Sequence, residues 1–251
     1  DVLWFDFSYP KEDGSGKGRK DWESEKLVEL IRRRRPSIIL DDRLDLPGVG
    51  DIHTPEQWQP RRWVTKNGTK VVWEACQTLS GSWGYHRDEA TFRSVDELIR
   101  TLIDCVSKGG NLLLNVGPTS RGEFDHRALE RLRGIGTWMK RHSRSIYGCT
   151  EAPEGFACPK DGRLTYNPDT RRLYLHLYSW PYKQVHLDGW KGKVAYAQLL
   201  HDGSEVAMKG LDDWQLPAAA EGGFQPDTLS ISLPQTPPAG VAVPVVEFFL
   251  A

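Results

Sequence analysis

The first 150 residues alternate between short apolar runs and longer amphipathic segments. Four apolar runs, each followed by polar residues, predict short strands at residues 2–5, 38–40, 71–73 and 112–114. Apolar residues recur at helical spacing and predict helices at residues 24–35, 95–108 and 125–142. Ser24 and Ser94 are candidate N-caps, and Pro36 would end the first helix. Short apolar strands that mostly alternate with amphipathic helices are typical of a parallel β/α sheet.

After about residue 147 the pattern changes to strict alternation broken by turns. The run RLTYNPDTRRLYLHLYSW predicts a hairpin with NPDT at its turn, and further short alternating runs follow at close intervals. We therefore predict two domains. Residues 1–150 would form a partial (β/α) barrel of about four parallel strands, and residues 151–251 an antiparallel β-sandwich.

Charge and length exclude several classes of protein. The 251 residues carry 33 Lys and Arg against 34 Asp and Glu, a formal net charge of −1, which argues against a nucleic-acid binder. The basic run Arg32 to Arg35 fits a last helical turn that complements the helix dipole better than a nucleic-acid patch. No apolar run approaches the roughly 18 residues that cross a bilayer, so we expect no membrane partner.

The cysteines and histidines predict neither a disulfide scaffold nor a metal site. None of the four cysteines forms a C-x-x-C pair, and no His, Cys and Asp spacing resembles a metal-binding motif. Cys149 and Cys158 lie close in sequence, and either a disulfide or two free thiols is compatible with their positions.

Polar residues follow the predicted strands, where the active site of a parallel β/α array lies. The candidates are Asp6 after the first strand, Asp41, Asp42 and Arg43 after the second, Trp73 and Glu74 at the third, and Asn115 after the fourth, with Glu56 in a connecting loop. Asp6 and Glu56 could form the carboxylate pair of a retaining glycosidase. Alternatively, Asp6 caps a turn and Glu56 is a solvated loop residue.

Five motifs occur in an order that resembles one enzyme family. DVLWFDF, DDR, TPEQW, WEACQTLSGSWGYHRDE and GGNLLLNVGPTSRGEF together resemble the motif series of the α-L-fucosidases of glycoside hydrolase family 29. The resemblance runs from residue 1 to about residue 147. It implies that Asp6 is the nucleophile, Glu56 the acid/base and Arg43 a sugar contact. Trp4 and Trp73 match aromatic, pocket-lining positions of the family.

The resemblance implies an exo-acting retaining α-L-fucosidase that acts on fucosylated glycans without a cofactor. Trp58 is a candidate substrate-binding residue, because it could form with Trp63 a platform for the leaving group, although packing under the long loop fits both residues equally well. The alternative function is a non-catalytic or weakly sugar-binding fragment. A nucleic-acid-binding protein is the weakest interpretation because of the net charge.

The sequence departs from the family in lacking the first half of its barrel. DVLWFDF reads as a buried strand that starts at residue 1, and no histidine pair that could grip fucose hydroxyls is found among the seven histidines. Four strands cannot close a barrel, since closure takes about eight. A preceding segment, a rearranged fold or a second copy must cover the strand edges, and we expect a homo-oligomer that completes the barrel.

Overall fold

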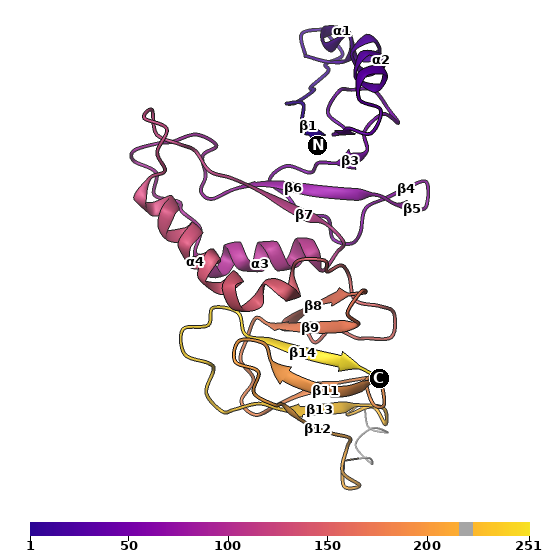
Figure 1. Ribbon diagram of the computed structural model, residues 1–251, viewed down its shortest axis with the longest axis vertical. Coiled ribbons are helices and arrows are strands. Elements are labelled where there is room, and N and C mark those ends of the chain that lie inside the picture. The colour runs from indigo at the N-terminus through magenta and orange to yellow at the C-terminus, as the bar shows by residue number, and fades with distance from the viewer. Residues whose placement is uncertain (216–222) are drawn as a thin grey trace. The chain divides into compact units, whose positions relative to one another are not determined.

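The computed structural model describes residues 1–215 and 223–251 and divides the chain into two compact units (Figure 1). The first unit is Asp1–Gln77 with Gly110–Leu114, and the second is Thr78–Gly109 with Asn115–Ala251. The predicted domain boundary at residue 150 stays a prediction. No helix of the described ranges is both long and apolar enough to cross a membrane.

The first unit holds the candidate site. Its elements are β1 (Val2–Leu3), α1 (Arg19–Trp22), α2 (Ser24–Arg34), β2 (Ile39–Leu40), β3 (Ile52–His53), β4 (Thr65–Lys66), β5 (Thr69–Lys70), β6 (Val72–Thr78) and β7 (Asn111–Asn115). All four strands predicted in this part of the chain are therefore present. The third is longer than predicted, so that Trp73 and Glu74 lie inside β6 instead of following it.

The strands of the first unit belong to separate small sheets. β1 and β2 pair in parallel, with Val2 opposite Ile39, whereas β3, β6 and β7 form a second sheet in that order, in which β3 and β6 are parallel. β6 and β7 run side by side in Figure 1. The parallel pairing is thus confirmed for two pairs. A continuous fragment of four barrel strands is not confirmed, because the hydrogen bonds place β2 and β6 in different sheets.

The N-terminal strand is not buried as the apolar run suggested. Val2 is 48% and Leu3 36% exposed, and Ile39 opposite them on β2 is 39% exposed. Within the described residues β1 has a single hydrogen-bonded neighbour, so one of its edges and much of its apolar surface face solvent.

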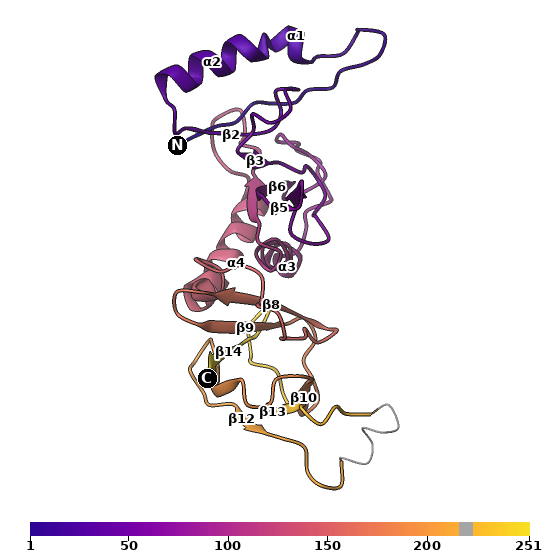
Figure 2. The same ribbon diagram turned by 90° about the vertical axis from the view of Figure 1, so that its right-hand side faces the viewer.

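The helix α2 begins differently from the prediction. Ser24 is buried and its hydroxyl donates to the backbone oxygen of Leu44, while Glu23, with φ of 49°, occupies the N-cap position. The predicted cap is therefore wrong, because the hydroxyl serves a tertiary contact instead. α1 and α2 follow each other nearly in line (Figure 2). Arg32 in the last turn donates to the oxygen of Ile38 and pairs with Asp51, which supports a structural role for the arginine run.

The second unit contains two helices and the antiparallel strands. Its elements are α3 (Val95–Val106), α4 (His126–His142), the 3-10 turn η1 (Ser143–Ser145), β8 (Gly162–Asn167), β9 (Arg172–Leu177), β10 (Gln184–Leu187), β11 (Val194–Leu199), β12 (Ala207–Lys209), β13 (Leu229–Ser232) and β14 (Val245–Leu250). Ser94 caps α3 as predicted, since its hydroxyl accepts from the Glu97 backbone N–H. The NPDT hairpin is confirmed by β8 and β9, which pair antiparallel.

The strands of the second unit form two antiparallel sheets. One has the order β11-β14-β9-β8 and the other β10-β13-β12. Side chains of both, such as Leu175, Ile231 and Phe248, belong to one hydrophobic cluster. A second cluster joins α3 and α4 to the four-stranded sheet, and the Trp138 indole donates to the oxygen of Val243 at 2.8 Å. The helices are therefore anchored on the β-sheet part of this unit.

Candidate active site

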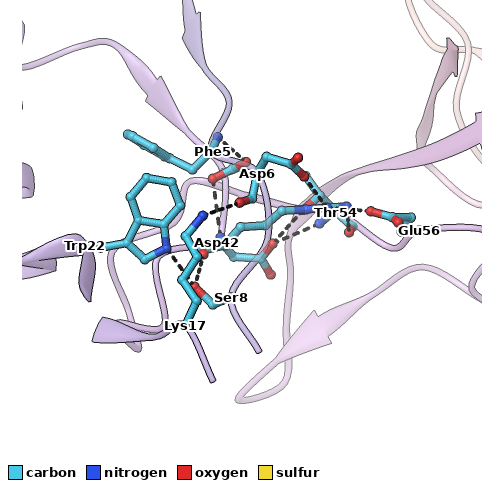
Figure 3. Close-up of polar contacts among 10 residues, drawn as sticks. Phe5, Asp6, Ser8, Lys17, Trp22, Asp42, Thr54 and Glu56 are labelled. Atoms are coloured by element: carbon cyan, nitrogen blue, oxygen red, sulfur yellow. Dashed lines mark hydrogen bonds and ion pairs between the residues drawn. The ribbon is translucent and has the colours of Figure 1, made fainter. Parts of the chain in front are cut away.

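The Arg43 guanidinium is the centre of the candidate site. Arg43 follows β2, is only 8% exposed, and its Nη1 donates to Glu56 Oε2 at 2.6 Å. The same Nη1 lies 3.9 Å from Asp6 Oδ1. Two carboxylates that are 50 residues apart in sequence therefore share one guanidinium nitrogen (Figure 3).

The separation of the two carboxylates follows from these two contacts. Asp6 Oδ1 and Glu56 Oε2 cannot be more than 6.5 Å apart, the sum of their distances of 3.9 Å and 2.6 Å to Arg43 Nη1. Retaining glycosidases place their two carboxyl groups roughly 5–5.5 Å apart, and inverting enzymes roughly 6.5–9.5 Å apart. The geometry therefore favours the retaining spacing.

Glu56 is held by hydrogen bonds to β6. The Cys76 backbone N–H donates to the oxygen of Pro55, and the Gln57 N–H donates to the oxygen of Cys76 at 2.9 Å, so Glu56 lies between two anchored residues. Its side chain reaches Arg43 and is 27% exposed. The loop that carries Glu56 is therefore fixed to the sheet next to the site.

Asp6 reaches further into solvent. Its side chain is 86% exposed, and its backbone oxygen accepts from Lys17 Nζ at 3.0 Å. Lys17 in turn lies over the Trp22 ring, 3.7 Å from its centre (Figure 3). The backbone at Asp6 is thus held by residues of the following loop and helix, while its carboxylate is free to contact a ligand.

The two aspartates before Arg43 hold different parts of the site. Asp42 accepts from the Thr54 N–H and hydroxyl, and its other oxygen lies 2.6 Å from His53 Nδ1. Burial would raise the pKa of Asp42, but the hydrogen bond and charge of His53 and the bonds from Thr54 lower it to about 2. Asp42 is therefore ionised at neutral pH and fixes Thr54.

Thr54 passes this constraint to Arg43. Its hydroxyl accepts from Arg43 Nε at 3.0 Å, and its backbone oxygen accepts from Arg43 Nη2 at 3.2 Å. Together with Glu56, these contacts engage all three nitrogens of the guanidinium. Side-chain freedom is thereby removed from Arg43 before any ligand binds.

The predicted aromatic residues divide into two groups. Trp4 lies against the site, because its ring centre is 4.2 Å from the Arg43 guanidinium carbon. Trp58 is 54% exposed and its ring meets His53 edge-on at 6.4 Å. Trp73 is fully buried, and Gly110 leaves the space that its indole fills. The structure thus brings Trp4 to Arg43, but it places Trp73 in the core of the unit.

The remaining candidates have structural contacts. Trp63 donates from its indole to the oxygen of Val71, which fits packing under the β4–β5 hairpin. The Asn115 amide donates to the oxygen of Trp83 at 2.7 Å. All four cysteines are free thiols, so the Cys149–Cys158 disulfide is absent. Within residues 1–215 and 223–251, no three His, Cys, Asp or Glu side chains gather as a metal site would require.

His53 and Thr54 are the site residues that the sequence interpretation missed. They lie at the end of β3, a strand of two residues, Ile52 and His53. A strand this short leaves no periodic pattern, and the available signal was the proximity of H-T to the T-P-E motif. Their role becomes visible only when Asp42 and Arg43 are brought to them.

Comparison with known proteins identifies the family. The family model described as alpha-L-fucosidase matches residues 1–144. Plasma alpha-L-fucosidase of Rattus norvegicus is 36% identical over 192 residues, which cover 72% of this chain and 39% of that protein. The plasma enzyme of Homo sapiens is 35% identical over 194 residues, with the same coverage of both chains.

A solved structure supports the same relationship. The alpha-L-fucosidase isoenzyme 1 from Paenibacillus thiaminolyticus aligns with a TM-score of 0.85 and 35% identity, over 100% of this chain and 58% of that one. The chain thus spans well under two thirds of the length of each of these relatives. With a family match over more than half of its residues, this chain belongs to the α-L-fucosidase family.

Proposed function

We propose that this chain carries the catalytic carboxylates of a retaining α-L-fucosidase that releases terminal α-L-fucose from fucosylated glycans. The observation that supports the proposal most strongly is the contact of Asp6 and Glu56 with the same nitrogen of Arg43. This contact limits the separation of the two carboxylates to the range in which one can attack the sugar while the other serves the leaving group.

In the first step a carboxylate oxygen of Asp6 attacks the anomeric carbon of fucose. The bond from that carbon to the glycosidic oxygen breaks, and Glu56 gives its proton to the departing oxygen. Since Glu56 accepts from Arg43 in the structure, it must leave Nη1 when it is protonated, and a fucose hydroxyl can then accept from the guanidinium.

In the second step water replaces Asp6 at the anomeric carbon. Glu56 takes a proton from the water, the new carbon–oxygen bond forms, and the bond to Asp6 breaks. The configuration at the anomeric carbon is inverted twice and is therefore retained. The step needs a water molecule near Glu56, whose side chain is partly exposed.

We expect the Glu56→Ala variant to be rescued by azide. Loss of the proton donor should lower kcat for a fucoside with a poor leaving group by roughly 10²–10⁴-fold, because general acid catalysis contributes about that much. Azide needs no general base, so it should accelerate the variant on an activated aryl fucoside and give α-fucosyl azide. The unsubstituted chain is the control and should not be accelerated. A folded variant that ignores azide, or yields the β-azide, would contradict the assignment.

A non-catalytic sugar-binding fragment is the second candidate. The observation that favours it is the 86% exposure of the Asp6 side chain, since a nucleophile usually works in a partly desolvated pocket. The two functions differ in turnover of a chromogenic α-L-fucoside. Binding of fucose by calorimetry without release of the chromophore would support the second function, and turnover would exclude it.

We propose further that two copies of this chain associate and complete a barrel. The apolar side chains of Val2, Leu3 and Ile39 on the β1–β2 sheet are 36–48% exposed, which makes this sheet a surface for pairing. Light scattering should then give at least twice the monomer mass of 28.5 kDa. Val2→Lys should shift the mass toward the monomer because a charge cannot be buried unpaired. An active species of 28.5 kDa would contradict the proposal.

A further inference from the structure

The Asp41 carboxylate connects the backbone of the two residues that position the proposed site. It is fully buried, its Oδ2 accepts from the Phe5 N–H at 2.8 Å, and its Oδ1 accepts from the Arg43 N–H at 3.3 Å. Phe5 directly precedes Asp6. One side chain after β2 therefore holds the peptide next to the nucleophile and the peptide of the guanidinium.

We infer that Asp41 is a positioning residue that fixes Asp6 and Arg43 relative to each other, so that both carboxylates of the site meet the same guanidinium nitrogen. This inference rests on the proposed function of Asp6, Arg43 and Glu56. Asp41 itself makes no contact with the reacting groups, because its side chain is buried and occupied by the two backbone amides. Its effect on the reaction would be exerted through Asp6 and Arg43.

The two bonds require a carboxylate. Each oxygen of Asp41 accepts one N–H, and a carboxylate has two acceptor oxygens, whereas an asparagine amide has one acceptor and one NH₂ group. In Asp41→Asn the NH₂ group must therefore face an N–H donor, and one of the two bonds is lost. The shape of the side chain is unchanged, so the variant tests the bonds and not the packing.

The electrostatic setting of Asp41 makes its state measurable. Burial raises the pKa of Asp41 to about 6, although its hydrogen bonds from Arg43 and Phe5 and the charge of Arg43 act in the opposite direction, while the charge of Asp42 raises it further. An amide proton that is bonded to a carboxylate changes its chemical shift when that carboxylate is protonated. The amides of Phe5 and Arg43 thus report on Asp41 directly.

Asp51 offers a matched control. Its Oδ2 also accepts a backbone N–H next to β2, that of Leu40 at 2.7 Å, and it pairs with Arg32. It has no hydrogen bond to Phe5, Asp6 or Arg43 in the described part of the chain. Asp51→Asn therefore removes a carboxylate that holds the same strand without touching the proposed site.

The first experiment compares kinetics and stability. Asp41→Asn should lower kcat for an aryl α-L-fucoside by about 100-fold while KM changes less than threefold, because a misplacement near 1 Å costs about that much. Asp51→Asn should keep kcat within about twofold of the unsubstituted chain. Asp41→Glu, which keeps both acceptors on a longer arm, should recover part of the loss. Equal kcat values for Asp41→Asn and Asp51→Asn, or a loss explained entirely by unfolded protein, would overturn the inference.

The second experiment does not depend on turnover or on a folded variant. In ¹H–¹⁵N spectra of the unsubstituted chain, the Phe5 and Arg43 amides should shift together with one midpoint near pH 6. Amides that do not move, or that move with different midpoints, would overturn the inference. If the unsubstituted chain releases no fucose, the proposed function fails, and the amide titration alone decides whether Asp41 holds both peptides.

Discussion

Asp6→Gly should lower kcat/KM for an α-L-fucoside by at least about 10⁴-fold, because no other carboxylate of the proposed site can take the place of the nucleophile. Glu56 and Asp6 approach the same nitrogen from different segments, and Asp42 is occupied by His53 and Thr54. A loss of this size corresponds to roughly 5.5 kcal/mol of transition-state stabilisation. It would be among the largest effects of any single substitution in this chain.

The fold should survive this substitution. The Asp6 side chain is 86% exposed and its one ion pair, to Arg43, is long at 3.9 Å, so its removal costs little packing. The melting temperature should therefore stay within a few degrees of the unsubstituted chain. Asp13→Gly is a suitable control, since Asp13 is an exposed carboxylate in the next loop that bonds only to Ser15 among the described residues.

The product formed with azide distinguishes the nucleophile from a residue that only supports the fold. With an activated α-fucoside, azide can enter the space that the Asp6 carboxylate vacates and attack from the same face. The product should be β-fucosyl azide, the opposite anomer from that expected for Glu56→Ala. A rate for Asp6→Gly close to that of Asp13→Gly would remove the assignment, as would the α-azide as the product.

The motifs predicted the members of this site better than its construction. Asp6, Arg43 and Glu56 each lie in a separate short motif, and their order along the chain was enough to select them. The contact that unites them depends on Thr54, which bridges Asp42 and Arg43. No pattern in one sequence indicates such a bridge, because it is made by tertiary contacts between loops and not by a regular element.

The fold shows the same division between local and distant causes. Ser94 and the NPDT turn act on neighbouring residues, and both were predicted correctly. Ser24 has the same chemistry as Ser94, but the oxygen of Leu44 competes for its hydroxyl, and the predicted cap is absent. The exposure of Val2 was also missed, because burial depends on what lies beside a strand and not on its own apolar character.

Trp73 illustrates a limit of assigning function by residue type. An aromatic residue close to the strand ends was predicted to line the pocket, and its contact with substrate stays a prediction. In the structure its indole is fully buried, and a Cβ on Gly110 would come within 2.2 Å of the ring. The pairing of a large ring with a glycine on the adjacent strand is a packing requirement that composition alone does not reveal.

The stability of the second unit should fall steeply between pH 6.5 and pH 4, because two buried histidines cannot be protonated without disrupting it. His142 on α4 and His176 on β9 are 1% and 0% exposed. The His142 Nδ1 lies 2.9 Å from the oxygen of Trp138, an acceptor, so that nitrogen carries the proton. The other nitrogen, Nε2, has no hydrogen-bond partner among the described residues.

His176 is held in its neutral form by a similar argument. The Thr165 hydroxyl donates to the oxygen of Ser145 at 2.7 Å, so it must accept from His176 Nε2 at 2.9 Å. The proton of His176 is therefore on Nε2, and its buried Nδ1 lacks a partner within residues 1–215 and 223–251. A second proton on either ring would place an unpaired charge in the interior.

The sign of the pH effect follows from the lowered pKa values. Burial is the main cause that lowers the pKa of His142 to about 4, with His201 and Arg141 adding repulsion, and burial with repulsion from His142 lowers that of His176 to about 3. In the unfolded chain both titrate near about 6.5. The stabilisation is therefore complete above pH 6.5 and is lost as the pH falls toward pH 4 and pH 3, where the folded state begins to bind the same protons.

Urea unfolding of the chain at pH 7, 6, 5 and 4.5, followed by tryptophan fluorescence, measures this dependence. The free energy of unfolding should fall by up to about 2.7 kcal/mol for each pH unit below 6, about 1.4 kcal/mol for each histidine. His142→Gln and His176→Gln should each remove about half of that slope, whereas His126→Gln, at a side chain that is 87% exposed, should leave it unchanged. Because the raised pKa of Asp41 acts in the opposite sense and is common to all four proteins, the differences between their slopes isolate the histidines. Equal slopes in the unsubstituted chain and in the His142→Gln, His176→Gln double variant would show that the two rings are protonated in the folded state at little cost, and the tautomers assigned from Trp138 and Thr165 would then be wrong.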